Sequence, residues 1–183
     1  MEHIESYATG DFYDTGSFDV SCDPLLYGPE RITLEYRIYS RSDPKDLSEI
    51  LTYIQEVFRQ AYDQVLSGVF SAYKHAPKWD VWMDETKEFL RIDFTEKEEL
   101  HPYIGRPIVE LAFCNKKAFW GLTFPGGTNK LSFEHGFCTV FEQEKLLVLA
   151  DNDLPSVLKW WDHYSSDGNM LPAFGSEKNI SIF

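Results

Sequence analysis

One long amphipathic segment constrains the fold of this chain more than any other feature. Between residues 47 and 73, apolar side chains recur mostly at alternating steps of three and one positions, which places them on a single stripe of a helix. The stripe consists of Leu47, Ile50, Leu51, Ile54, Val57, Phe58, Ala61, Tyr62, Val65, Leu66, Val69, Phe70 and Tyr73. Because this stripe is wider than the seam of a coiled coil, it predicts a helix that packs on a sheet.

The ends of this helix are also marked in the sequence. Asp43 can cap the first turn and Pro44 suits the first helical position, whereas Pro77 stops the pattern. Gly68 leaves two alternatives open, one unbroken helix or two shorter ones. A second, shorter helical signal follows at 95–100, where Thr95 and Glu98 have the spacing of a capping box.

Short apolar or alternating stretches on both sides of the helix predict the sheet. The predicted strands are 18–22, 32–38, 79–83, 89–94, 108–114, 119–124, 131–133, 137–141 and 146–149. The stretches 108–114 and 119–124 are separated by a short polar turn and predict a hairpin. The sequence therefore predicts an α+β fold, a mainly antiparallel sheet with one long amphipathic helix packed on one face.

Composition places the chain among globular proteins. It has 183 residues, of which 43% are hydrophobic, so we expect one domain over 1–183 with loose ends at 1–17 and 165–183. The acidic N-terminus lacks the apolar stretch of a signal peptide, and no apolar run approaches the length of a membrane helix. Three widely spaced cysteines indicate neither a disulfide framework nor a zinc site. We therefore expect a soluble protein of the reducing cytoplasm, with no membrane partner.

Charge narrows the classes of partner. The chain has 17 basic and 30 acidic side chains, a formal net charge of −13. Such a charge repels a phosphate backbone and argues against nucleic-acid binding. It favours a basic protein as partner, because opposite potentials steer association. The oligomeric state does not follow from these numbers.

The cluster Glu134-His135-Gly136 is the strongest candidate for chemistry in the sequence. A carboxylate beside an imidazole can form an acid–base pair, but adjacent residues of a strand point to opposite faces. The two side chains would share a site only if a bulge turned one of them, and Gly136 is where a bulge could form. Three interpretations stay open: a structural hydrogen-bonded corner, a partner contact, or a catalytic pair formed by Glu134 and His135.

Other motifs indicate structure more than chemistry. The segment 125–130 lacks the Gly-Lys-Ser/Thr ending of a phosphate-binding loop and joins strands. Asp151 and Asp153 lack the glycine and glutamate of a calcium loop, so we predict a turn, and we predict no metal site and no cofactor. Trp160 and Trp161 are neighbours on a short predicted helix, and at least one should lie at an edge of the core. We therefore interpret Trp160 and Trp161, with Asp151 and Asp153, as a candidate partner-binding surface.

Three short stretches together resemble an uncharacterised family of bacterial domains. They are the Gly-Leu-x-Phe strand at 120–124, the Glu-His-Gly corner at 133–137 and the apolar strand at 148–151. The segments 58–73 and 95–100 occupy the places of that family's apolar helix and its Ser/Thr-x-Glu-Glu-Leu turn. This chain has Phe137-Cys138 where the family usually has Leu-Gly, and Ala150-Asp151 where Gly-Gly often follows the last strand.

The resemblance covers residues 58–153 and implies no established activity. Some similar proteins lie beside polymorphic toxins and resemble immunity proteins, which bind and neutralise a toxin. Together with the charge, this leads to the hypothesis of a binding protein, of the immunity type, that inhibits a basic toxin. The alternatives are a small enzyme that uses Glu134 and His135 in a pocket, and a structural or regulatory interaction module.

Overall fold

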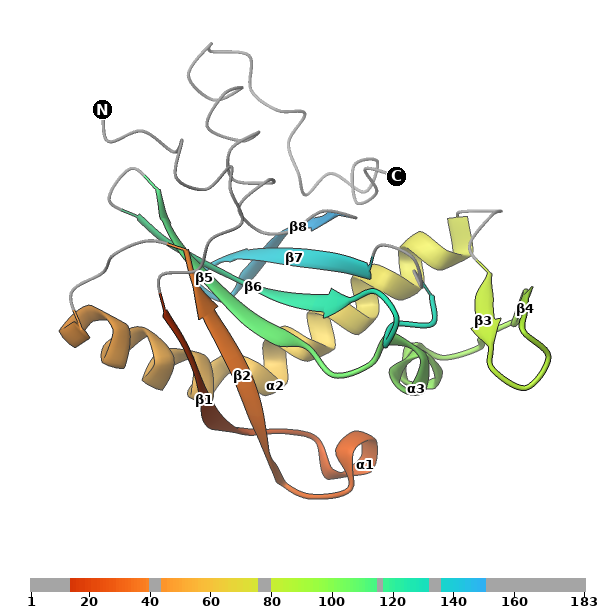
Figure 1. Cartoon of the computed structure of the whole chain (residues 1–183), viewed down its shortest axis with the longest axis horizontal. Helices are drawn as coiled ribbons and strands as arrows, with labels where there is room; N and C mark the ends of the chain where they lie inside the picture. Colours follow the sequence, from red (N-terminus) through yellow and green to blue (C-terminus); the bar gives the residue numbers. More distant parts are fainter. Residues whose placement is uncertain (1–13, 40–43, 76–79, 115–116, 132–135, 151–183) are drawn as a thin grey trace, which may run out of the picture.

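The structure, a computed structural model, describes residues 14–39, 44–75, 80–114, 117–131 and 136–150. Its main element is a six-stranded sheet crossed by one long helix, α2 (Pro44–His75), as Figure 1 shows. The strands of this sheet are β1 (Asp14–Ser21), β2 (Arg31–Ile38), β5 (Ile108–Cys114), β6 (Lys117–Pro125), β7 (Gly136–Glu142) and β8 (Lys145–Ala150). The predicted α+β class is confirmed.

The sheet is mostly antiparallel, in the order β1-β2-β5-β6-β7-β8. Only β2 and β5 pair in parallel, because α2 and several shorter elements carry the chain between them. The predicted hairpin of β5 and β6 is confirmed, with Leu111 opposite Trp120. Every other neighbouring pair in this sheet is antiparallel as well.

Helix α2 is continuous, and the alternative of a break at Gly68 is wrong. A Cβ atom added at Gly68 would lie 3.4 Å from Cδ2 of Leu146, an ordinary van der Waals contact, so the packing against β8 does not require a glycine. The buried residues of α2 belong to the same apolar cluster as residues of β1, β2, β5, β6, β7 and β8. Phe58, Tyr62 and Leu66 are among them, each at most 3% exposed. A separate cluster, including Ala112, Cys138 and Val148, contains residues that alternate with core residues along β5 and β7.

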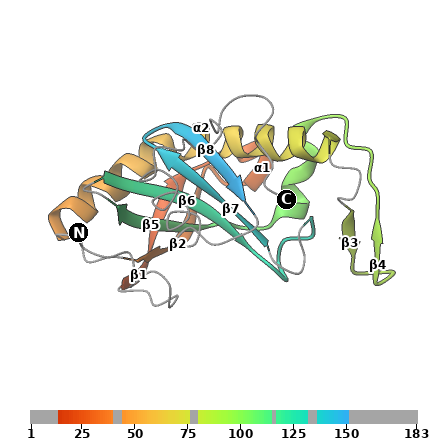
Figure 2. The ribbon, with the colours of Figure 1, turned by 90° about the horizontal axis from the view of Figure 1, so that it is seen from above.

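The helix reaches both edges of the sheet. It contacts the edge strands β1 and β8, and Figure 2 shows it running along one side of the sheet. Two glutamine side chains of α2 form hydrogen bonds with backbone groups at these two sheet edges. The Gln55 amide donates to the Asp19 carbonyl at 2.9 Å, and Gln64 both donates to the Glu144 carbonyl and accepts from the Leu146 N–H. Backbone groups that an edge strand would otherwise leave unpaired are satisfied in this way.

Several predicted boundaries differ from the structure. Strand β1 begins at Asp14, earlier than the alternation predicted, and Gly16 fits there because a Cβ would collide with the ring of Tyr36. A short helix, α1 (Pro24–Tyr27), capped by the Asp23 side chain, was not predicted between β1 and β2. Leu131 is not in a strand, and the rest of that predicted strand lies outside the described residues.

The predicted strand 89–94 is shorter than expected. Strand β4 (Glu88–Leu90) stops at Leu90, because the Tyr73 hydroxyl accepts from the Ile92 N–H and donates to the Ile92 carbonyl. One side chain of α2 thus takes both backbone groups that a longer strand would use.

The short helical turn begins later than predicted. It is a 3-10 helix, η2 (Lys97–Leu100), followed by α3 (His101–Ile104). Its capping box is formed by Glu96 and Glu99, one residue after the predicted pair Thr95 and Glu98. The Glu99 carboxylate also accepts from the Thr95 N–H at 2.6 Å.

No helix in the described part of the chain is long and apolar enough to cross a membrane.

The hydrogen bonds of Gln64 lead to a stability prediction. Replacing Gln64 by Ala leaves the Leu146 N–H and the Glu144 carbonyl without their partner, so we expect unfolding to become easier by about 1–2 kcal/mol. Gln60→Ala, at an exposed position of the same helix, should change stability by less than about 0.5 kcal/mol. Urea denaturation of both variants measures the difference, and equal midpoints would show that the hydrogen bonds of Gln64 do not stabilise the fold.

Candidate functional site

The side chains that the sequence singled out cannot be placed in the structure. All six candidates lie outside the described residues: Glu134, His135, Asp151, Asp153, Trp160 and Trp161. Whether Glu134 and His135 share a pocket therefore stays a prediction. Gly136, which follows these two residues in the sequence, is described by the structure and is the first residue of β7.

Gly136 has a structural reason to be glycine. Its φ angle is +73°, and it pairs with Pro125 at the start of the β6–β7 ladder. A Cβ at this position would collide with the carbonyl oxygen of Phe124 and the backbone nitrogen of Gly126. The irregularity in the pairing of β7 with β8 lies further along the strand, between Val140 and Phe141. Gly136 thus permits close backbone approach where β7 enters the sheet.

We expect Gly136→Ala to destabilise the fold by about 3 kcal/mol or more, since strain at positive φ adds to a backbone collision. Gly127→Ala is the matched control, because Gly127 has a φ angle of +82° but open space around its Cβ position. The control should lose only about 1–2 kcal/mol. Thermal and urea unfolding of the two variants test the prediction, which a similar loss in both would contradict.

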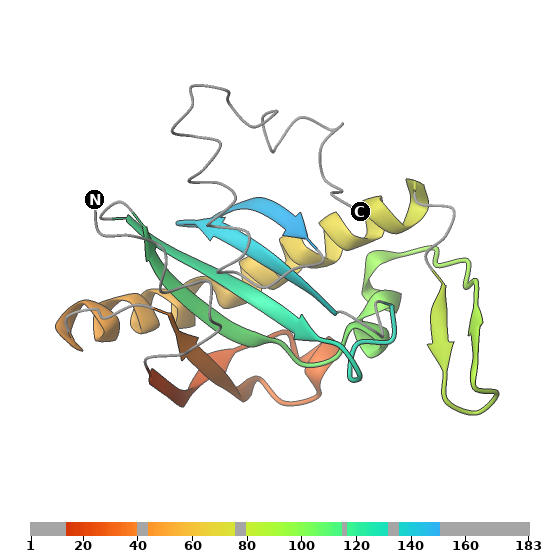
Figure 3. The ribbon, with the colours of Figure 1, turned by 45° about the horizontal axis from the view of Figure 1, so that its top comes forward.

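A projecting hairpin is the most distinctive surface feature of the described residues. Strands β3 (Val81–Met83) and β4 (Glu88–Leu90) form a two-stranded sheet of their own, separate from the six-stranded sheet (Figure 3). Their turn, residues 84–87, is closed by a 2.8 Å bond from the Lys87 N–H to the Met83 carbonyl. Lys87 takes a φ angle of +58° to make it.

The hairpin exposes apolar side chains. Phe89 and Leu90 are 47% and 42% exposed, and Leu25 is the other exposed large hydrophobic side chain in the described residues. Phe89 lies opposite Trp82, with the two rings edge to face and their centroids 5.0 Å apart. The pair forms an aromatic patch on one face of the hairpin. Val81, on the other face, is fully buried.

The base of the hairpin is held by specific contacts to the body. The backbone N–H of Trp82 donates to the Lys130 carbonyl at 2.9 Å, and the Lys130 ammonium pairs with the Asp84 carboxylate at 2.8 Å. On the β4 side, the Arg91 guanidinium lies 4.0 Å from the centre of the Tyr73 ring and donates to the Tyr73 carbonyl. These contacts fix the direction in which the hairpin points.

Negative charge is concentrated in the same segment. Residues 80–99 carry eight carboxylates against three basic side chains, a local charge of −5 in a chain whose total is −13. Lys97 is engaged by Asp63 of α2 at 2.6 Å. In the hairpin turn, the exposed Glu85 and the strand residue Glu88 have no ion-pair or hydrogen-bond partner within the described residues. The hairpin therefore presents exposed carboxylates in its turn and, at Glu88, on the face opposite the aromatic patch.

Sequence reasoning predicted strands at this place but did not identify them as a binding surface. The available signal was the polar turn 84–87, rich in charge, between two short stretches that each contain aromatic residues. Exposure of Phe89 could not be inferred, because the same alternation suits a strand buried on one face.

Asp84 supplies a test of how the hairpin is anchored. The bond from Lys130 holds the pKa of Asp84 below its ordinary value of 3.8, helped by the indole N–H of Trp82, which donates to Asp84 at 3.0 Å. Because the folded state favours the ionised form of Asp84, the stabilisation from the Lys130–Asp84 ion pair is fully present above pH 3.8. It is lost as the pH falls through the lower folded-state pKa of Asp84.

We expect the Trp82 indole N–H resonance to titrate with a midpoint below pH 3.8 and, in Lys130→Met, with a midpoint shifted up toward that value. A pH series of ¹H–¹⁵N spectra measures both midpoints, with the resonance assigned by its loss in Trp82→Phe. An unchanged midpoint in the lysine variant would show that Lys130 does not hold the carboxylate.

Possible metal ligands and two of the cysteines can be examined in the described part of the chain. No group of three or more His, Cys, Asp or Glu side chains there could hold a metal ion. Cys22 and Cys138 are buried thiols, and burial raises the pKa of Cys22 above its ordinary value. A raised thiol pKa disfavours the reactive thiolate.

Comparisons with known proteins found no relative from which a function could be transferred: no family model matches the chain, and no curated protein or solved structure is significantly similar to it.

Proposed function

We propose that this chain is a protein-binding inhibitor of the immunity type, whose β3–β4 hairpin docks on a basic surface of a target protein. The observation that carries the proposal is the projecting hairpin itself, with exposed Phe89 on one face and exposed carboxylates at Glu85 and Glu88. The resemblance of residues 58–153 to a bacterial family with immunity-like members also supports the inhibitor proposal.

Charge supports a basic partner. Opposite potentials accelerate encounter and disfavour wrong partners, and the effect is strongest where like charges are grouped. The segment 80–99 concentrates carboxylates at one place, and Glu85 lies in the turn at the tip of the hairpin. A hairpin of this charge fits a cleft lined by Lys and Arg, such as the active site of an enzyme that acts on nucleic acid.

The aromatic patch supports a specific contact. Interfaces draw most of their binding energy from a few aromatic or Arg side chains that become fully buried, surrounded by polar groups that exclude water. Phe89 has the required exposure, and its contact with Trp82 restricts its motion before binding. Glu85, in the exposed turn next to the patch, provides part of the polar surround. The hairpin thus combines an anchor with a charged rim.

The test uses the proteins encoded beside this chain's own gene as targets. Each is expressed with the full chain, and binding is measured by titration calorimetry along with the survival of cells that produce the target. We expect one basic target to bind at equal stoichiometry and to lose its toxicity. Absence of both binding and protection for every neighbouring product would refute the inhibitor proposal.

Two variants test whether the hairpin is the contact. Phe89→Ser should weaken binding about tenfold or more by removing a central anchor. Glu85→Lys with Glu88→Lys should slow association and reduce its dependence on salt. The matched control is Glu35→Lys with Glu49→Lys, which makes the same charge change on β2 and α2 at exposed positions. If the control weakens binding as much as the hairpin variants, net charge and not the hairpin determines affinity.

A further inference from the structure

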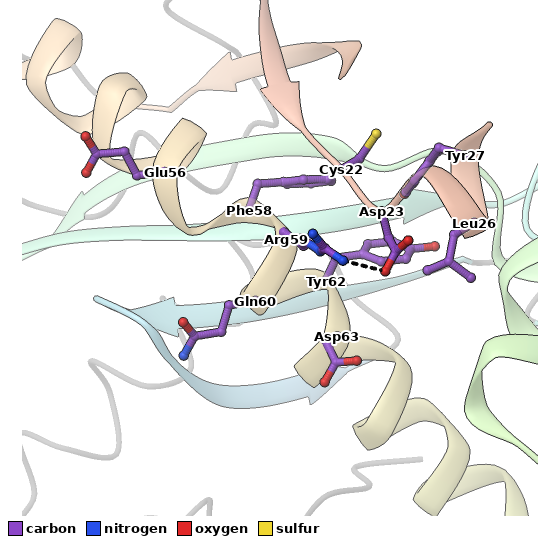
Figure 4. Close-up of a pocket in the computed structure, with 10 residues that line it drawn as sticks. All are labelled: Cys22, Asp23, Leu26, Tyr27, Glu56, Phe58, Arg59, Gln60, Tyr62 and Asp63. Atoms are coloured by element: carbon purple, nitrogen blue, oxygen red, sulfur yellow. Dashed lines mark hydrogen bonds and ion pairs between the residues drawn. The ribbon is translucent and has the colours of Figure 1, made fainter. Parts of the chain in front are cut away.

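The six-stranded sheet has a second apolar face, on the side opposite to α2. On its own side, α2 packs on the sheet and also meets the β1–β2 connection, where Arg59 pairs with Asp23 at 3.0 Å (Figure 4). On the opposite side, residues of β5, β6, β7 and β8 form the separate apolar cluster, here called the far face. Its main side chains are Ala112, Phe119, Cys138, Val140, Val148 and Ala150.

The far face is buried, and the described elements do not account for its burial. Each of the six side chains is at most 8% exposed. Among the described residues, the cluster includes no side chain from a helix or from the β3–β4 hairpin. Because an apolar sheet face has to be buried against another layer, its cover comes from residues outside the described ranges or from another molecule.

The buried area ends between β5 and β2. Glu110 of β5 points to the far side, since it alternates with core residues of that strand, and its side chain is 1% exposed. Its carboxylate accepts from the Tyr39 hydroxyl at 2.8 Å and lies 3.7 Å from the guanidinium of Arg37, which is 32% exposed. Glu35, further along β2 on the same side, is exposed. The buried area therefore spans four strands, or about 14 Å.

The path of the chain favours the segment after β8 as the cover. Strand β8 ends at Ala150, which is itself part of the far face, and 33 residues follow it. Residues 1–13 instead precede β1, the edge strand at the other end of the sheet. To reach the far face they would have to cross β1 and β2, whose side chains on this side are polar and largely exposed. The segment after Ala150 needs no such crossing.

The sequence of this segment has the pattern of a helix with one apolar side. Four apolar side chains recur there at steps of three, one and three residues, as on one stripe of a helix. They are Leu154, Val157, Leu158 and Trp161. A helix over residues 154–164 would be about 16 Å long, which matches the width of the far face.

We propose that residues 154–164 form a helix that docks on the far face, with the stripe that contains Leu158 and Trp161 turned toward the sheet. The sheet then lies between this helix and α2. Trp161 becomes part of the core, whereas Trp160, turned by about 100° from it around the helix, is the member of the pair that a partner can reach. The proposal does not depend on the inhibitor function, because the β3–β4 hairpin contributes no residue to the far face.

The reactivity of Cys138 measures whether the far face is covered. Cys138 lies on the far face and Cys22 in the core on the α2 side, and both are at most 4% exposed. The full chain is treated with N-ethylmaleimide, and the modification of each cysteine is followed by mass spectrometry of its peptide. Leu158→Asp should accelerate the modification of Cys138 about tenfold or more and leave Cys22 unchanged, because only the cover opens. An unchanged rate at Cys138 would overturn the proposal.

His163→Asp is the matched control. It adds the same charge as Leu158→Asp, but at a position about 180° from the centre of the apolar stripe. We expect both cysteines to keep the rates that they have in the unaltered chain. If His163→Asp accelerates Cys138 as much as Leu158→Asp does, the apolar stripe is not what docks and the proposal is overturned.

A second measurement needs no variant. In the full chain labelled with ¹³C and ¹⁵N, we expect nuclear Overhauser effects between the methyl protons of Val140 or Val148 and side-chain protons of residues 154–161. Absence of every such contact would overturn the assignment of the segment. This measurement decides the question also if Leu158→Asp unfolds the chain and accelerates Cys22 together with Cys138.

Dilution distinguishes the segment from a second copy of the chain. A cover that belongs to the same chain protects Cys138 equally at every concentration, whereas a dimer dissociates on dilution. We therefore expect the rate of Cys138 modification to stay constant over about a hundredfold dilution of the unaltered chain. Faster modification at low concentration would overturn the proposal and show that a second copy covers the far face.

Discussion

The burial of one face of α2 against the six-stranded sheet is the interaction on which the rest of the structure depends. The helix has 32 residues and is about 48 Å long, whereas six strands span only about 24 Å. A helix longer than the sheet is wide can contact both edge strands and still extend beyond them. Gln55 and Gln64 form hydrogen bonds with backbone groups at the two edges of the sheet. The helix that buries the core therefore also satisfies backbone groups at both sheet edges.

Two surface features follow from this arrangement. The C-terminal part of α2 carries Tyr73, which bonds the backbone of Ile92, contacts Arg91 and thereby ends β4. The hairpin consequently stands apart from the sheet and exposes Phe89. In the middle of α2, Tyr62 and Arg59 meet the β1–β2 connection and line a groove. One helix therefore positions the exposed hairpin and this groove at separate places.

Much of the fold could be predicted from local patterns. The stripe of α2, the alternation of β2 and the hairpin of β5 with β6 were all predicted, because a helix or strand with one buried face imposes its period on the sequence. Errors arose where a distant side chain decides the backbone. Tyr73 shortens β4, and this contact leaves no mark on the residues that neighbour Ile92 in the sequence.

The sequence by itself determined the elements, their approximate order and the acidic character of the surface, since these depend on local periodicity and composition. Only the tertiary structure decided where function can be sought. The contact of the buried Tyr62 hydroxyl with His101 and the exposure of Phe89 result from contacts between segments far apart in the chain. Whether a polar group is satisfied or an aromatic ring is covered depends on those long-range neighbours, which the residue types alone do not specify.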